Sequence, residues 1–341
     1  MLLRNHEVTK VQSLLNREGN LTEPGWSRQL VQEYHRKDIK APKIRIKEWD
    51  YYLVMGPKFG AAFTISDNGY IGLQSVSILD FTKPFEHTES ILKLFPMGKL
   101  HLPETSITGD SIYVDKRLQL RVEVSEGKRH ITCNFLQFDG DKDFQCDIVL
   151  EQPKMDTMVI ATPWEKKHHF YYNQKINCMP ASGWMKYGDQ EYEFHPETEF
   201  GVLDWGRGVW TYENIWHWGS GSCMLDGVRF GFNIGYGFGN TKAATENIIF
   251  YNDQGHKLDD ITFHIPENDY LLPWTVTSSD GRFEMKFEPI IDRCAKIDFK
   301  VLLSDQHQVF GKMSGTAILD DGTKLHIQDM MCFLERVHNR Y

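Results

Sequence analysis

A strict alternation runs through Arg282-Phe283-Glu284-Met285-Lys286-Phe287-Glu288, in which every second residue is apolar and the others are charged. Successive side chains of a β-strand point to opposite faces, so this segment has one apolar face and one charged face. Such a strand packs on a core with one face and meets water with the other, which is typical of antiparallel sheet. The segment therefore predicts an antiparallel β protein.

The period of two recurs along the chain, for example at residues 118–124 and 297–303. Dipeptides that supply the positive φ angles of tight hairpins separate these runs. They are Asn68-Gly69, Glu126-Gly127, Asp226-Gly227, Gln254-Gly255, Asp280-Gly281 and Asp321-Gly322. Helical patterns are confined to residues 8–17 and 28–37. We predict an all-β chain of two antiparallel lipocalin-like β-barrels or sandwiches in tandem, with short N-terminal helices.

The length of 341 residues predicts two domains at about 150 residues per domain. Clusters of proline and polar residues lie at 151–162 and 179–200, and we place the boundary near Pro180. Residues 1–180 would then form an N-terminal antiparallel β domain with a helical lead-in. Residues 181–341 would form a C-terminal β-barrel domain.

The composition excludes several classes of protein. Hydrophobic residues make up 41% of the chain and charged residues 25%, which excludes disordered, collagenous and fibrous proteins. The formal net charge is −9, and no block of Lys or Arg is present. The chain therefore lacks the basic surface that binds nucleic acid or an anionic membrane. Aromatic residues reach 13%, with 9 Trp, 14 Tyr and 21 Phe, and this excess directs attention to an aromatic site.

The first residues, Met1 to Glu7, have no apolar core of signal-peptide length. No stretch approaches the roughly 18 apolar residues that span a bilayer. The cysteines are scattered, without a Cys-x-x-Cys pair, at Cys133, Cys146, Cys178, Cys223, Cys294 and Cys332. We therefore expect free buried thiols and a cytoplasmic protein.

One predicted strand, residues 229–239, is rich in glycine. Its aromatic residues and Ile fall on one face, and Gly231, Asn233, Gly235 and Gly237 fall on the other. Glycine in a strand lets another backbone or a ligand approach closely. Two compatible interpretations follow, a tight crossing or bulge in a barrel and a smooth wall beside a ligand cavity. In the second interpretation Asn233 and Tyr236 contact the ligand.

The densest group of functional side chains lies at residues 201–218, with four Trp, a Tyr, the acids Asp204 and Glu213, a guanidinium and an imidazole. Desolvation pushes a carboxyl enclosed by aromatic rings toward its neutral form, so it can donate a proton near neutral pH. The same rings can stabilise a carbocation. We predict Asp204 as the proton donor, with Arg207 and His217 orienting water or polarising the substrate. The predicted ligand-binding residues are Trp205, Trp210, Tyr212, Glu213, Trp216, Trp218, Asn233 and Tyr236.

An alternative is purely structural, with the tryptophans in the core and Asp204 paired to Arg207. Aromatic rings are also platforms for sugars, and Glu213 with Asp204 would then be a carboxylate pair of the glycosidase kind. His195, Glu197 and Glu199 would share a strand face, but no second ligand cluster supports a metal there. We therefore assign no metal ligands and predict no cofactor.

The stretch Asp204-Trp205-Gly206-Arg207-Gly208-Val209-Trp210, followed by Trp216-His217-Trp218, resembles the central signature of the DUF2804 family. Three further stretches fit the resemblance: Gly25-Trp26, residues 47–52 with Tyr70-Ile71-Gly72, and residues 333–341, where Tyr341 stands at an expected terminal Trp. More distantly the chain resembles the group of AttH and carotenoid 1,2-hydratase. That resemblance implies two lipocalin-like barrels and an Asp-x-x-Trp-Gly motif, although here Asp204 directly precedes Trp205. Some members of that group hydrate isoprenoid double bonds, and relatives cyclise polyenes.

Three hypotheses of function follow. The first is acid-catalysed hydration or cyclisation, a lyase-type reaction, of an apolar unsaturated small molecule. The second is a carbohydrate-active enzyme that uses the Trp cluster as a sugar platform. The third is a non-catalytic lipocalin-like carrier of a hydrophobic ligand. In each, the partner is a small molecule, apolar or a sugar, with no nucleic acid and no membrane span. The oligomeric state stays open.

Overall fold

The computed structural model describes residues 4–267, 269–299 and 302–340. The described residues contain strands and two 3-10 turns, η1 (Arg36–Asp38) and η2 (Lys43–Arg45). The strands are β1 (Gln12–Ser13), β2 (Gly25–Ser27), β3 (Gln32–Glu33), β4 (Lys47–Met55), β5 (Phe59–Asp67), β6 (Ile71–Asp80), β7 (Phe85–Leu94), β8 (Ser111–Val114), β9 (Leu118–Ser125), β10 (Lys128–Asp139), β11 (Lys142–Glu151), β12 (Met158–Pro163), β13 (Phe170–Tyr187), β14 (Gln190–Phe194), β15 (Phe200–Val209), β16 (Glu213–Leu225), β17 (Val228–Tyr236), β18 (Ile248–Tyr251), β19 (Gln254–Lys257), β20 (Ile261–His264), β21 (Trp274–Ser278), β22 (Phe283–Phe299), β23 (Leu302–Ile318) and β24 (Lys324–Arg340). The predicted all-β class is confirmed.

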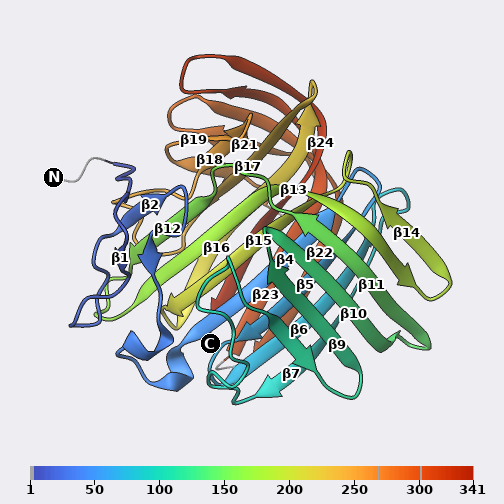
Figure 1. Ribbon diagram of the computed structural model, residues 1–341. Helices are drawn as coiled ribbons and strands as arrows, with labels where there is room; N and C mark the ends of the chain where they lie inside the picture. Colours follow the sequence, from blue (N-terminus) through green and yellow to red (C-terminus); the bar gives the residue numbers. More distant parts are fainter. Residues whose placement is uncertain (1–3, 268, 300–301, 341) are drawn as a thin grey trace.

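Two large antiparallel sheets build the molecule, each curled into an open half-barrel (Figure 1). The first has 13 strands, with the main path β7-β6-β5-β4-β15-β13-β11-β10-β9-β8 and with β2, β12 and β14 attached. The second has 9 strands in the order β19-β18-β17-β16-β24-β23-β22-β21-β20. The chain leaves the first sheet after Val209 and enters the second at Glu213. Pro180, the predicted domain boundary, lies inside β13, and β13 pairs with both β14 and β15.

The predicted N-terminal helices are wrong. Residues 8–17 and 28–37 contain only β1, β3 and the 3-10 turn η1. The Gln12 N–H donates to the carbonyl of Val31 at 3.0 Å, and the Leu14 N–H donates to that of Glu33 at 2.9 Å. The two segments therefore satisfy their backbone groups by pairing with each other, which overrides a local helical pattern.

Alternation places the apolar faces of both sheets in cores. In the alternating segment 282–288, Phe283, Met285 and Phe287 are buried, whereas Glu284 and Lys286 are exposed. A further apolar cluster joins the sheets, with Tyr51 and Val202 from the first and Phe310 and Phe333 from the second. The two half-barrels therefore pack against each other through side chains as well as through the chain connection.

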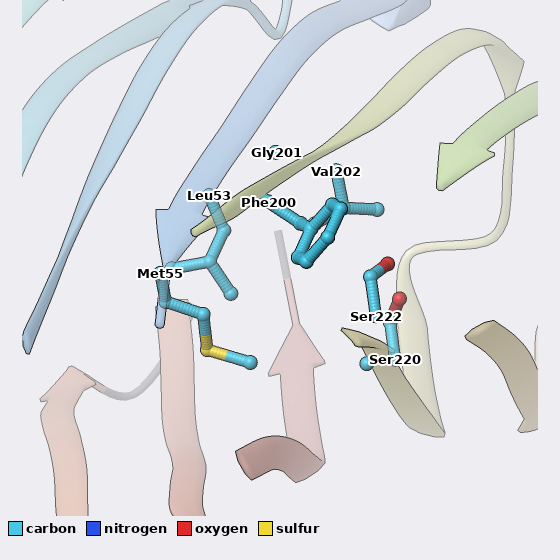
Figure 2. A pocket seen from close by; sticks show the side chains of 8 residues that line it. Leu53, Met55, Phe200, Gly201, Val202, Ser220 and Ser222 are labelled. Carbon is cyan, nitrogen blue, oxygen red and sulfur yellow. The ribbon is translucent and has the colours of Figure 1, made fainter. Parts of the chain in front are cut away.

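A small cavity of about 10 Å³ lies within this packing (Figure 2). Leu53, Met55 and Val202 of the first sheet line it opposite Ser220 and Ser222 of the second. A space of this size holds about one water molecule. The sheets are therefore closely packed at this point.

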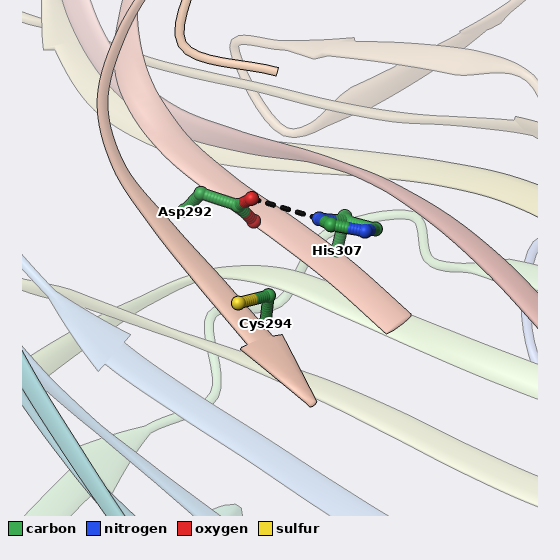
Figure 3. A group of neighbouring side chains, drawn as sticks. All are labelled: Asp292, Cys294 and His307. Atoms are coloured by element: carbon green, nitrogen blue, oxygen red, sulfur yellow. Dashed lines mark hydrogen bonds and ion pairs between the residues drawn. The ribbon is translucent and has the colours of Figure 1, made fainter. Parts of the chain in front are cut away.

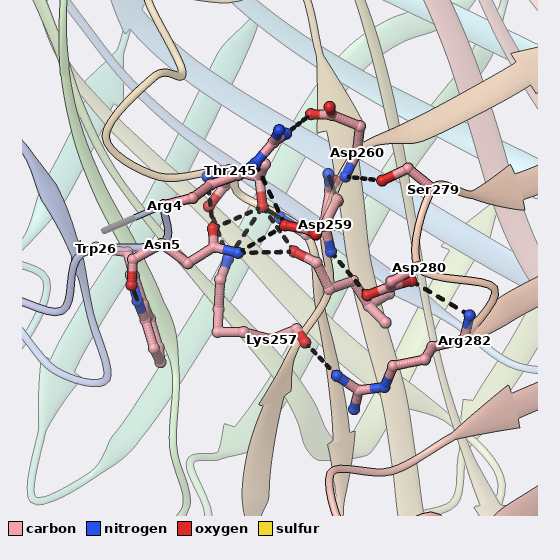
Figure 4. A network of polar contacts seen from close by, with 12 residues as sticks. Arg4, Asn5, Trp26, Thr245, Lys257, Asp259, Asp260, Ser279, Asp280 and Arg282 are labelled. Carbon is pink, nitrogen blue, oxygen red and sulfur yellow. Dashed lines mark hydrogen bonds and ion pairs between the residues drawn. The ribbon is translucent and has the colours of Figure 1, made fainter. Parts of the chain in front are cut away.

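The N-terminal residues cross to the second sheet (Figure 4). Arg4 forms an ion pair with Asp259, with Nε and Oδ1 3.3 Å apart. The Asn5 side chain donates to Asp259 Oδ1 at 3.2 Å and accepts the Thr245 N–H at 3.0 Å. The N-terminal residue Asn5 thereby holds the loop at 237–247, between β17 and β18, in place. This loop contributes two side chains to the site described below.

All six cysteines are free, and four of them are buried. None of the helical turns among the described residues has the length or the apolar character to cross a bilayer.

Candidate active site between the two sheets

Asp204 lies on β15 directly opposite Lys175 of β13. The Lys175 Nζ is 3.0 Å from Asp204 Oδ1, and the Asn173 side-chain amide donates to the same oxygen at 2.5 Å. The side chains of Lys175 and Asp204 are 3% and 10% exposed. A buried ion pair is stable only while both charges and their hydrogen bonds are present. Asp204 is therefore one half of a hydrogen-bonded ion pair rather than an isolated acid.

The Lys175 ammonium also lies over an indole ring. Its Nζ is 4.0 Å from the ring centroid of Trp218, which favours the cation electrostatically. Trp218 Nε1 donates to Asn233 Oδ1 at 2.7 Å, and the Asn233 amide donates to the carbonyl of Glu246 at 2.8 Å. The ion pair of the first sheet is thus connected to β16, β17 and the fixed loop of the second.

Glu335, on β24, is the second acid of the site. Its two carboxyl oxygens accept hydrogen bonds from Trp216 Nε1 and from the Gln308 amide, each at 3.1 Å. Burial raises the pKa of Glu335 from 4.5 to about 7, although the Trp216 hydrogen bond and the charge of Lys175 oppose the shift. Glu335 therefore holds a proton over a pH range in which an exposed glutamate has lost it.

Glu246, from the fixed loop, is the third acid. Burial raises its pKa, the Lys175 charge opposes this shift, and the Asp204 charge adds to it. Its Oε2 is buried without a hydrogen-bond partner among the described residues. One lysine thus faces three carboxyls, and burial favours the protonated form of two of them.

Aromatic rings enclose one side of this cluster. Phe238 lies at their centre, with ring centroids 4.5 Å from Tyr171, 5.2 Å from Trp216 and 5.3 Å from Trp210. Tyr171 is buried, with 5% of the residue exposed, and burial with the nearby Glu246 and Asp204 charges raises its pKa well above 10.0. The arrangement offers aromatic faces beside a proton donor, which is the combination that stabilises a carbocation.

Trp205 and Arg207 lie on the opposite face of β15. Arg207 forms an ion pair with Asp50, with Nη1 and Oδ1 2.9 Å apart, and its guanidinium is 4.2 Å from the Trp205 ring centroid. Trp205 belongs to the core of the first sheet. The structural alternative, a pair of Asp204 with Arg207, is therefore not what forms, because residues of odd and even number point apart in a strand.

His217 and Tyr236 are likewise placed away from Asp204. They stack on each other at 4.3 Å on the core side of the second sheet, next to Phe263. Burial lowers the pKa of His217 to about 4, and the charge of Arg336 adds to this effect. Tyr212 is 47% exposed, and Glu213 pairs with His338 at 2.8 Å. Of the predicted residues, the structure brings together Asp204, Trp210, Trp216, Trp218 and Asn233.

Lys175, Glu246 and Glu335 were not predicted from the sequence. A signal for Glu335 was present, since alternation puts it on one face with apolar Phe333 and Val337. An acid on an apolar face is a desolvated acid, which marks a candidate functional group. Lys175 and Glu246 lie in segments without such a pattern, and only the packing of the sheets reveals them.

The glycine face of β17 is used for close contact between the sheets. A Cβ on Gly231 would lie 2.7 Å from Cys178 Sγ of β13, and one on Gly235 would lie 2.7 Å from Glu246 Oε1. Both contacts are closer than real Cβ atoms make. The lack of a side chain at Gly231 therefore allows β13 of the first sheet to pack closely, and the lack of one at Gly235 leaves room for the Glu246 carboxyl.

Gly231→Ala is expected to lower the free energy of unfolding by about 1–3 kcal/mol, because overpacking forces neighbouring atoms to shift. The nearest atom is Cys178 Sγ, so the loss is expected to be smaller when the substitution is made in a Cys178→Ala background. Urea unfolding of the four variants of this cycle measures the difference. An equal loss in both backgrounds would show that the sulfur does not limit the space.

A separate groove of about 460 Å³ lies at the edge of the first sheet. His195 and Glu199 line it, together with Tyr192. Glu199 Oε2 accepts the His195 N–H at 2.8 Å and the Thr198 hydroxyl at 2.9 Å, so this carboxylate stabilises its own turn. The groove holds none of the three buried acids.

Comparisons with known proteins agree with this architecture. Two solved structures share the fold: a protein of Nitrosomonas europaea described as AttH, and kievitone hydratase from Nectria haematococca. The AttH structure has 12% identity and a TM-score of 0.51, with 89% of this chain and 94% of that chain covered. The hydratase has 9% identity and a TM-score of 0.52, with 96% and 98% covered. A search of curated proteins finds no match.

At these identities the two structures show a common fold. The family comparison is more specific, because residues 5–341 match the family described as "Domain of unknown function (DUF2804)". The match spans both sheets and the Asp-Trp-Gly-Arg motif at 204–207. The resemblance to DUF2804 is thus confirmed, the resemblance to the AttH group is confirmed in its fold, and the chain belongs to the DUF2804 family.

Proposed function

We propose that this protein is an enzyme that adds water to, or cyclises, an unsaturated small molecule, with Glu335 as the proton donor. The observation that carries the proposal is the buried Glu335 carboxyl, whose pKa is raised to about 7, beside the Lys175–Asp204 ion pair. An efficient general acid has a pKa near the working pH. The sequence analysis predicts this role for Asp204, but Asp204 Oδ1 lies 3.0 Å from the Lys175 ammonium, and a buried ion pair requires the charged carboxylate.

The proposed reaction begins when the π electrons of a carbon–carbon double bond take the proton from Glu335. A carbocation forms on the adjacent carbon, and the aromatic face of Trp216 lowers its energy. The Asp204 carboxylate, held by Lys175, supplies negative charge nearby. In hydration, water attacks the cation and releases a proton that returns to the Glu335 carboxylate. In cyclisation, a second double bond of the substrate attacks instead, and loss of a proton restores the acid.

The fold supports hydration as the first reaction to test, since a protein of this fold bears the name of a hydratase. Shared fold by itself does not assign a reaction, so the buried acids remain the main support. Tyr171 is expected to stay a phenol, because its pKa is raised well above 10.0. It can therefore donate a hydrogen bond to a polar group of the substrate throughout the reaction.

The test uses wild-type protein and Glu335→Gln. Native mass spectrometry identifies a ligand that co-purifies with either protein, and that ligand is incubated with both proteins in ¹⁸O-labelled water, together with a panel of polyenes and aryl-substituted alkenes. We expect the wild type to form a product heavier by one labelled water, or an isomer without added mass for cyclisation. Glu335→Gln is expected to retain the unconverted substrate.

A bound lipid that both proteins release unchanged would support the carrier hypothesis instead. A sugar as the co-purifying ligand, hydrolysed by the wild type, would support the carbohydrate hypothesis. Equal conversion by the wild type and Glu335→Gln would remove Glu335 from the mechanism.

A further inference from the structure

Three potential metal ligands lie together on the second sheet (Figure 3). Asp292 and Cys294 are two residues apart on β22, so they share one face of the strand. His307 on β23 is the cross-strand partner of Cys294. One ligand atom from each residue lies within 4.8 Å of the other two. The pairing register of a hairpin therefore produces an oxygen, a sulfur and a nitrogen donor at one place.

The His307 imidazole is held in a defined orientation. The ring of Tyr270 stacks on it with centroids 3.8 Å apart and an interplanar angle of 9°. His307 Nδ1 is 2.7 Å from Asp292 Oδ2, as the dashed line in Figure 3 shows. The other ring nitrogen, Nε2, is 3.6 Å from Asp305 Oδ1. This distance is longer than a hydrogen bond, but it places a carboxylate on the side of the second nitrogen, where metal-binding histidines usually have one.

Asp292 has an unused acceptor. Its Oδ1 is buried and lacks a hydrogen-bond partner among the described residues, although Oδ2 is bonded to His307. A buried oxygen without a partner is unfavourable unless something fills its place. The Asp292 side chain is 16% exposed and that of His307 20%, whereas Cys294 is exposed. The cluster is therefore backed by protein on one side and open to solvent on the other.

We propose that Asp292, Cys294 and His307 bind a Zn²⁺ ion, or another transition-metal ion of similar softness, with solvent in the fourth position. A thiolate, an imidazole and a carboxylate suit zinc, whereas Mg²⁺ and Ca²⁺ prefer oxygen ligands alone. On binding, the Cys294 thiol loses its proton to solvent. The proton between His307 Nδ1 and Asp292 Oδ2 moves to Nε2 of a neutral imidazole, or to solvent if Nε2 is already protonated, and each of the two freed atoms forms a bond to the ion.

The charges near the cluster are compatible with a divalent cation. Asp292 and the Cys294 thiolate together balance its two positive charges. The next carboxylate, Asp305, is 3.3 Å from Arg336 and so is already compensated. No metal ligands were predicted from the sequence, and Asp292 and Cys294 form no recognisable motif until β23 places His307 beside them.

The test measures metal binding directly and uses no substrate, so it is independent of the proposed catalytic function. The untagged wild-type chain is titrated with Co²⁺ and followed by absorption. We expect one equivalent to produce a thiolate-to-cobalt charge-transfer band in the near ultraviolet, which Zn²⁺ then abolishes by displacement. Cys294→Ser is expected to lose the band, and His307→Ala to weaken Co²⁺ binding by at least about 100-fold, more than loss of an outer partner costs.

Cys223→Ser is the matched control, since it removes a thiol of the same sheet that is outside the cluster. This variant is expected to keep the band. Circular dichroism of each variant establishes that it is folded, and Zn²⁺ is expected to raise the melting temperature of the wild type but not of Cys294→Ser. Absence of the band in the wild type, or its persistence in Cys294→Ser, would overturn the proposal.

Discussion

Glu335→Gln is expected to reduce the proposed hydration or cyclisation by about 10²- to 10⁴-fold, the contribution of a positioned general acid. Glutamine keeps the shape of the side chain and can keep one hydrogen bond to Trp216 or Gln308, but it has no proton to donate. Initial rates, measured by product formation in labelled water, give the ratio. Glu213→Gln is the matched control, because Glu213 lies on the adjacent strand and pairs with His338.

Glu335→Gln is also expected to change how the stability of the protein depends on pH. Burial raises the pKa of Glu335 in the folded protein to about 7, above its ordinary value of 4.5. Between these values the folded state keeps a proton that the unfolded chain releases, so the stability of the wild type falls as the pH rises. The total fall from this group is about 3 kcal/mol. Glutamine does not titrate, so the variant is expected to lose less stability between pH 4.5 and 7.

Wild-type activity is expected to fall as the pH rises through about 7, because the donor loses its proton. An unchanged rate in Glu335→Gln, or an activity that rises through this range, would contradict the assignment. If Glu335→Gln were much less stable than the wild type at low pH, Glu335 would have a structural role instead.

Lys175→Met is expected to lower the free energy of unfolding by about 3–5 kcal/mol, because it leaves the Asp204 carboxylate buried without its partner. The substitution keeps an unbranched side chain of similar length, so packing against Trp218 is largely retained. Denaturant unfolding of the wild type and of Lys175→Met, monitored by tryptophan fluorescence, measures the loss of unfolding free energy.

The double variant Lys175→Met with Asp204→Asn is the decisive comparison. It removes both charges, and replacement of a whole buried pair is often close to neutral, so it is expected to recover much of the stability. Lys128→Met is the control, since the Lys128–Glu151 pair is 58% and 61% exposed and such pairs contribute little. A double variant no more stable than Lys175→Met would show that the two charges do not stabilise each other.

Local patterns predicted much of this molecule correctly. The alternation of Phe283, Met285 and Phe287 and the short Gly turns established antiparallel sheet, because strand faces repeat every two residues. The same rule explains why some of the predicted site residues lie away from Asp204. Asp204 and Trp205 are neighbours in the chain, but they point to opposite faces of β15 and reach different cores.

The all-β class, the family and the concentration of aromatic side chains around Asp204 can be recognised in the amino-acid sequence. The groups that surround Asp204 depend on how the two sheets pack. Lys175, Glu246 and Glu335 come from β13, a loop and β24, and their meeting depends on strand order and register in two sheets. Register is set by burial summed over whole sheets, so no short stretch of sequence contains it. The N-terminal segments became strands for the same reason, since pairing with distant residues outweighed their local preference.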